Sequence, residues 1–105
     1  MATTTSKALA RTAAATSHTT LYTVPNTSTT AVVTNIVATN TATSSATFTI
    51  NIDSVALLSG VALAANSSAF FDLKQVIPAN ATPKTITGSA SATTVSFHIS
   101  GVEIV

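Results

Sequence analysis

Short runs of β-branched and aromatic residues, each stopped by a turn-forming residue, recur through most of this sequence. Residues 21–40, LYTVPNTSTTAVVTNIVATN, contain two such runs, separated by Pro25 and a polar loop. β-Branched side chains lose rotamer freedom in a helix but pack well on a pleated sheet. Nothing in the spacing of the apolar residues supports a long helix. The sequence therefore predicts an all-β chain.

About eight short strands are expected after residue 17. The clearest pattern lies at residues 46–52, where Phe48, Ile50 and Ile52 alternate with polar residues and so share one face. The expected strands are residues 18–24, 30–40 (bent or bulged), 46–52, 55–58, 61–63, 69–73, 84–91 and 93–105. Turns at this spacing are typical of a sandwich or barrel. We expect a single antiparallel β-sandwich of the jelly-roll type.

The last expected strand changes phase at Gly101. Val95, Phe97 and Ile99 share one face, whereas the next apolar residues are Val102 and Ile104. Glycine within a strand often marks an extra residue in the ladder, so we expect a β-bulge at this position with the apolar side chains kept inward.

Residues 1–17, MATTTSKALARTAAATS, differ in composition from the rest, and Leu9 is their one large apolar residue after Met1. We expect an extended N-terminal arm at residues 1–17 and a β-sandwich domain at residues 18–105. Lys7, Leu9 and Arg11 are the arm residues expected to contact a neighbouring subunit. The alternatives are a disordered tail and a short helix capped by Ser6.

Charged residues make up 7% of the chain, against roughly 25% in a typical soluble domain. So few charges protect a surface poorly against association, and uncharged strand edges are templates for pairing. We therefore expect a homo-oligomer or a larger assembly, with a hydroxyl-coated monomer as the alternative. The net charge of +1 offers no concentrated basic face for nucleic acid. The longest apolar run, residues 55–65, is too short to cross a membrane.

Ionisable side chains are too few and too scattered for a predicted catalytic or metal site. The three carboxylates have no motif spacing, His18 and His98 are far apart, and cysteine is absent. Neither a G-x-S-x-G motif nor a glycine-rich phosphate loop occurs. We expect no enzyme, no cofactor and no metal. Tyr22 and Phe70 are the aromatic residues predicted to lie at a protein interface.

Five segments form a recognisable pattern: LYTVP at residues 21–25, TAVV at 30–33, FTINI at 48–52, LAANSS at 63–68 and FDL at 71–73. Together they resemble a small structural protein family of tailed bacteriophages. The resemblance covers residues 21–105. This chain departs from it after Pro25, where relatives commonly carry Gly and Lys and this chain has Asn-Thr-Ser.

The resemblance implies a virion protein without enzymatic activity, made in the host bacterial cytoplasm and located on the capsid surface. The expected role is that of a head decoration (cement) protein, bound to the major capsid protein between capsomers. Trimers are the expected oligomer and dimers the alternative. The runner-up is a tail, neck or receptor-binding component, in which the loops at residues 26–29 and 78–83 would carry specificity.

Overall fold

The computed structural model describes residues 3–105, and this part of the chain contains eight strands and no helix. The strands are β1 (Thr4–Ala13), β2 (Thr19–Thr23), β3 (Thr30–Asn40), β4 (Ala46–Ile52), β5 (Val55–Leu63), β6 (Ser67–Ile77), β7 (Thr85–Ala90) and β8 (Val95–Ile104). One sheet, here called sheet A, has the order β1-β8-β3-β6, and the other, sheet B, has the order β2-β7-β4-β5.

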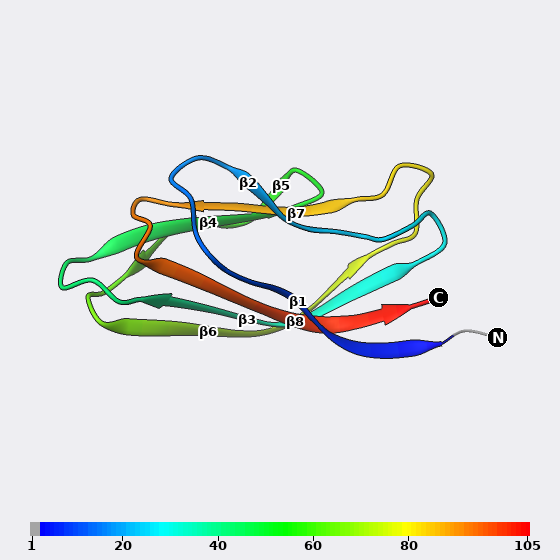
Figure 1. The fold of residues 1–105 in the computed structure, drawn as a ribbon, viewed down its shortest axis with the longest axis horizontal. Helices are drawn as coiled ribbons and strands as arrows, with labels where there is room; N and C mark the ends of the chain where they lie inside the picture. Colours follow the sequence, from blue (N-terminus) through cyan, green and yellow to red (C-terminus); the bar gives the residue numbers. More distant parts are fainter. Residues whose placement is uncertain (1–2) are drawn as a thin grey trace.

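Every pair of neighbouring strands is antiparallel. In sheet A, β8 lies between β1 and β3, and in sheet B, β7 lies between β2 and β4. Consecutive strands lie in different sheets except β4 and β5, which pair within sheet B, and this is the arrangement of an eight-stranded jelly roll. Figure 1 shows sheet B above sheet A, with the strands running along the long axis of a molecule that measures 49 × 22 × 17 Å. The predicted all-β antiparallel sandwich is confirmed.

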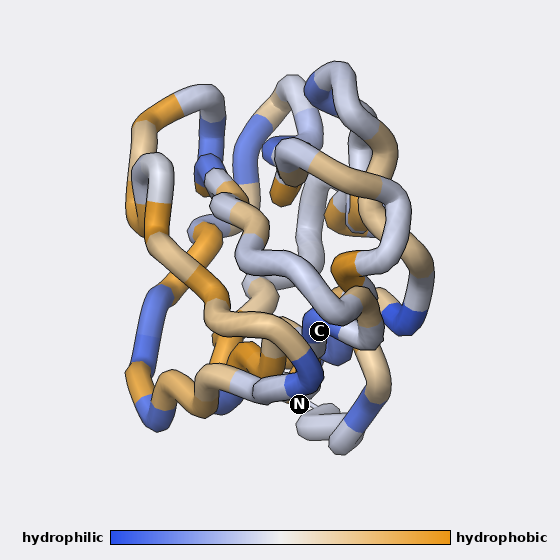
Figure 2. Tube along the Cα trace, turned by 90° about the vertical axis from the view of Figure 1, so that its left-hand side faces the viewer, coloured by the Kyte–Doolittle hydropathy of each residue, from blue (hydrophilic) through white to orange (hydrophobic). Residues whose placement is uncertain are grey.

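The core lies between the two sheets and is built from alternate residues of each strand. Its centre is an aromatic cluster in which Phe48 of sheet B packs edge-on against Phe97 and Phe71 of sheet A, with ring centroids 5.8 and 6.1 Å apart. Burying large apolar side chains contributes roughly 1.5–3 kcal/mol each. Figure 2 looks along the long axis and shows apolar and hydrophilic segments alternating along a mostly pale chain, since Thr and Ser have near-neutral hydropathy.

Two strand predictions match the observed bounds, and one pair of strands is fused. β3 and β4 begin and end where the sequence predicted, and β3 is irregular between Val33 and Asn35. The two short strands expected at residues 55–58 and 61–63 are a single strand, β5. Gly60 has a φ of 57° there, so it accommodates an irregular register against β4 without ending the strand.

Residues of the expected N-terminal arm form β1, the edge strand of sheet A, which pairs with β8 of the same chain. Backbone hydrogen bonds of 2.9 Å in both directions between Thr3 and Val105 continue this ladder to the end of the chain. The helix considered at Ser6 is not formed, because this segment is extended and its backbone groups bond to β8. The register shifts between Ala8 and Ala10, where Leu9 is the extra residue.

The prediction of a bulge at Gly101 in the last strand is wrong. The extra residues lie in the two strands that pair with β8, namely β1 and β3. β8 keeps its alternation, so Gly101 and Glu103 face inward while Val102 and Ile104 face outward. A Cβ on Gly101 would overlap the carbonyl of Val32 and lie 3.0 Å from Leu9 Cδ1. Atoms of Val32 and Leu9 therefore occupy the space that a side chain on Gly101 would need. Val102 and Ile104 consequently lie on the outer face of sheet A.

Candidate interaction surface

The structure separates the five residues predicted for an interface. Leu9 and Tyr22 are each 7% exposed and belong to the core of this chain's own sandwich, because both side chains point between the sheets. Lys7 and Arg11 lie on the edge strand β1, and Phe70 is 72% exposed on β6, the opposite edge of sheet A. Only the exposed three are available to a partner without unfolding.

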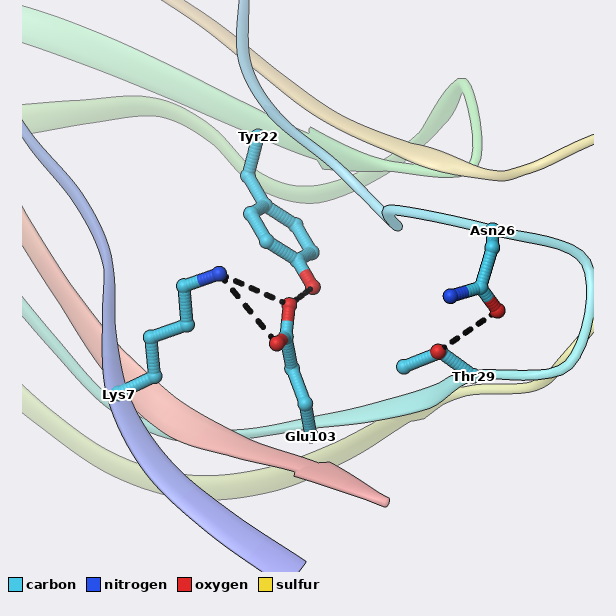
Figure 3. Close-up of polar contacts among 5 residues, drawn as sticks. All are labelled: Lys7, Tyr22, Asn26, Thr29 and Glu103. Carbon is cyan, nitrogen blue, oxygen red and sulfur yellow. Dashed lines mark hydrogen bonds and ion pairs between the residues drawn. The ribbon is translucent and has the colours of Figure 1, made fainter. Parts of the chain in front are cut away.

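Lys7 and Tyr22 meet at a residue that sequence reasoning missed, Glu103. The alternation of β8 points this carboxylate inward, where it is 9% exposed. Figure 3 shows the Tyr22 hydroxyl reaching from β2 to donate a hydrogen bond of 2.5 Å to Oε2. Lys7 Nζ lies 3.3 Å from both carboxylate oxygens. No local motif could have identified this contact, since Tyr22 and Glu103 are 81 positions apart.

This cluster holds the tyrosine in its neutral form. Burial, and then the hydrogen bond to Glu103 and the charge of that carboxylate, raise the pKa of Tyr22 well above its ordinary value. A protonated phenol donates a hydrogen bond but is a poor base or nucleophile near neutral pH. The hydrogen bond from Tyr22 to Glu103 therefore links β2 of sheet B to β8 of sheet A, and the ion pair with Lys7 links β8 to β1.

Residues 3–105 enclose no pocket, and they contain no group of three or more His, Asp or Glu side chains placed to hold a metal. The two histidines lie apart, since His18 contacts Asn51 of sheet B while His98 is exposed on sheet A. The same residues form no helix that could span a membrane.

The two outer faces of the sandwich differ in chemistry. The outward residues of sheet B are mostly hydroxyl and amide side chains, and paired examples are Thr20 with Thr87 and Thr49 with Ser89. Such residues suit a strand surface in contact with water. The outer face of sheet A carries aliphatic and aromatic side chains, from Val32 and Val37 on β3 to Phe70 on β6.

Charges are also divided between the two sheets. Among residues 3–105, ion pairs join Lys7 to Glu103 and Lys84 to Asp53, the latter at 3.2 Å. Arg11 and Asp72 are exposed on sheet A, at its two opposite edges. Asp72 accepts a hydrogen bond of 3.2 Å from the amide of Asn35 on the neighbouring strand, which holds the carboxylate on that face.

Comparison with known proteins finds structural neighbours only. No protein-family model and no curated protein sequence matches this chain. A chain from the crystal structure of the T13 IBDV viral particle superposes with a TM-score of 0.57 at 12% identity, over 98% of this chain and 30% of that chain. A chain from a structure of the infectious bursal disease virus Gx strain gives a TM-score of 0.50 at 16% identity, over 99% of this chain and 31% of that one. This chain thus shares a fold with part of each neighbour and spans about a third of its length.

Proposed function

We propose that this chain is a non-enzymatic structural protein of a virus particle, and more specifically a capsid decoration protein of a tailed bacteriophage. The observation that carries the proposal is the eight-stranded jelly roll, which spans nearly the whole chain and has neighbours in chains of viral particles. The resemblance of residues 21–105 to a phage structural family independently supports the narrower role.

The proposed partner is the major capsid protein, bound on the outer capsid between capsomers. A decoration protein stabilises a shell when it buries surface on two neighbouring capsomers at once. A face of hydroxyl side chains, such as that of sheet B, costs less to desolvate than a charged one. Lys7 on the β1 edge, whose side chain is 46% exposed, would contact acidic surface of the capsid. Extended edges allow strand addition across subunits, and many identical sites add avidity.

A tail, neck or receptor-binding component is the second candidate, supported by the position of two loops. The loop between β2 and β3 and the loop between β6 and β7 lie at the same end of the sandwich (Figure 1). Val24 N–H donates to the Lys84 carbonyl at 3.0 Å, and Ala79 N–H donates to Thr30 Oγ1 at 3.3 Å. Residues 26–28 and 78–82 in these loops are exposed. Exposed loops on a rigid scaffold are suited to specific recognition.

Copy number separates the two candidates. The experiment is quantitative mass spectrometry of purified particles of the virus that encodes this chain, with the major capsid protein as the internal standard. A ratio near one to one, or a simple fraction of it, is expected for a decoration protein. A few copies per particle would replace that role with the tail role, and absence from the particles would overturn both.

Thermal melting of the capsid gives a second readout for the decoration role. Particles that lack this chain are expected to open at a lower temperature than complete particles, because bound protein stabilises the state it binds. Adding purified protein back is expected to restore the melting temperature. Unchanged melting in particles that carry the chain in high copy would contradict stabilisation as its role.

A further inference from the structure

The outer face of sheet A carries two groups of apolar side chains on its strands. In one cross-strand row, Val32 of β3 lies between Val102 of β8 and Val76 of β6. Two rows further along, Val37 of β3 lies beside Phe70 of β6, and the row between the two groups is polar, with Ser100, Asn35 and Asp72. Phe70 and Val76 are 72% and 57% exposed. Exposed apolar side chains bordered by polar residues mark interaction sites.

The charged residues around these two apolar groups are distributed asymmetrically. Arg11 on β1 is in register with His98, which is in register with Val37, which is in register with Phe70. This row therefore begins with a cation at one edge of the sheet and ends with an aromatic ring at the other. Asp72 lies on the same edge strand as Phe70 and also faces outward.

Arg11 and Asp72 cannot pair within one chain. Three strand spacings of roughly 4.8 Å separate β1 from β6, and β8 and β3 lie between them. A two-fold rotation about an axis parallel to the strands, placed between β8 and β3, exchanges the two edges. It brings Arg11 of one copy over Phe70 of a second copy and within one row of its Asp72. At the same time it places Val32 of each copy over Val102 of the other, and Val37 over His98.

We propose that the outer face of sheet A is a two-fold interface between two copies of this chain. Its apolar contacts join Val32 of each copy to Val102 of the other, and its rim is a pair of symmetric contacts from Arg11 to Phe70 and Asp72 of the second copy. Such an interface is isologous, because the same patch serves both partners. It combines apolar contacts on the middle strands with polar contacts at the rim, a combination found in protein interfaces. An arginine over an aromatic face gains a cation–π contact, and the nearby carboxylate adds an ion pair.

Charge complementarity selects a second copy as the occupant. A partner of uniform charge would meet a cation at one edge and a carboxylate at the other, so one contact would be repulsive. A second copy related by the two-fold axis makes both contacts attractive. The inference is independent of the proposed function, since a dimer could form in or outside a virus particle. It favours the dimer over the trimer that the phage resemblance implies.

The experiment is sedimentation equilibrium of the purified chain and of charge-reversal variants. The wild-type chain is expected to be a dimer at micromolar concentration, and Phe70→Ser is expected to raise the dimer Kd at least about tenfold. R11D alone and D72R alone are each expected to raise Kd by about tenfold. The double variant R11D/D72R is expected to return Kd to within about threefold of wild type, because it restores an attractive pair.

Thr47→Asp is the matched control, since Thr47 is exposed on the outer face of sheet B. It adds a charge to the opposite side of the sandwich and is expected to leave Kd unchanged. A chain that stays monomeric up to about 1 mM, or that forms trimers, would overturn the proposal. A double variant no better than the single ones would overturn the pairing, because no contact within one chain could be rescued by this exchange.

Discussion

Two buried polar side chains, Asn40 and Glu103, lie at opposite ends of sheet A and are satisfied in different ways. Asn40 ends β3 and is fully buried, while Glu103 lies near the end of β8 at the other end of the sheet. Asn40 is neutral and bonds mainly to loops. Glu103 is acidic and bonds to side chains of two other strands. The comparison separates two ways of satisfying a buried polar group, one insensitive to pH and salt and one sensitive to both.

The Asn40 end is held by one amide that contacts several loops. Its Nδ2 donates to the Ser44 carbonyl at 2.8 Å. Its Oδ1 accepts from the backbone N–H of Ala42 and from Thr94 Oγ1, both at 3.1 Å. A buried amide that makes its bonds in this way fixes the turn after β3 and the loop before β8 in one geometry.

The largest expected effect is that of Asn40→Ala. The change leaves buried backbone groups without partners and opens a small cavity, so we expect a loss of about 3 kcal/mol in the free energy of unfolding. Urea unfolding at neutral pH measures it. Asn80→Ala is the control, since Asn80 also accepts a hydrogen bond in its loop, from the Thr82 N–H at 3.0 Å, but is exposed. We expect it to cost about 0.5 kcal/mol. Equal losses would show that burial does not distinguish the two amides.

At the opposite end, Glu103→Ala is expected to cost about 2 kcal/mol, because the Tyr22 hydroxyl loses its acceptor. Glu103→Gln keeps an acceptor of similar shape and is expected to recover at least half of that loss. Urea unfolding of both variants provides the measurement. If the Gln variant were as unstable as the Ala variant, the charge of Glu103 would matter more than its hydrogen bond.

Tyr22 is expected to make stability fall with pH in alkaline solution. Its folded-state pKa is raised, so its contribution is fully present below about pH 10, the ordinary value for the unfolded chain. Above that pH the unfolded chain loses the proton that the folded chain keeps, and stability decreases by about 1 kcal/mol per pH unit. Unfolding of wild type and Tyr22→Phe at about pH 9 and about pH 11 tests this. The Phe variant is expected to lose less.

The same ionisation can be followed directly in the folded state. Tyr22 is the only tyrosine in the chain, so the absorbance of tyrosinate reports this side chain alone. We expect its titration to begin only when the protein unfolds. A tyrosinate signal that rises at the ordinary pH in folded protein would contradict the buried hydrogen bond.

The smallest expected effect is that of Lys7→Met. The side chain of Lys7 is 46% exposed, and ion pairs near the surface are worth under about 1 kcal/mol. Unfolding at low and high salt is the measurement, and the loss is expected to shrink at high salt because the pair is screened. Lys74→Met serves as the control, since Lys74 forms no ion pair among residues 3–105. A salt-independent loss at Lys7 would indicate packing of its aliphatic stem instead.

Regular alternation of large apolar residues made part of the fold predictable. Phe48, Ile50 and Ile52 alternate with polar residues, and β4 begins and ends where that pattern does. β1 was not predicted as a strand of the sandwich, because Ala and Thr dominate it and only Leu9 is large. This segment is extended because it forms backbone hydrogen bonds with β8. The residues of β1 alone therefore do not indicate a strand.

The candidate interaction surface was less predictable because apolar residues face outward there while an acidic residue faces inward. Val102 and Ile104 were expected inward, yet they face outward while Glu103 faces inward. Local sequence favours the burial of apolar residues, and here the register imposed by β1 and β3 outweighs it. Alternation along β6 leaves Phe70 exposed and Phe71 partly buried. Contacts such as Tyr22 to Glu103 depend on tertiary structure alone.

The closure of β1 onto β8 has a consequence for how the chain acquires its structure. The paired strands β1 and β8 are the most distant in sequence, so β1 has no partner until β8 has been made. Contacts of such long range slow folding. A circular permutant that joins Val105 to Thr3 through a short linker would convert this pair into a local hairpin. With new ends in the exposed turn at Asp53 and Ser54, it should keep the sandwich and fold faster.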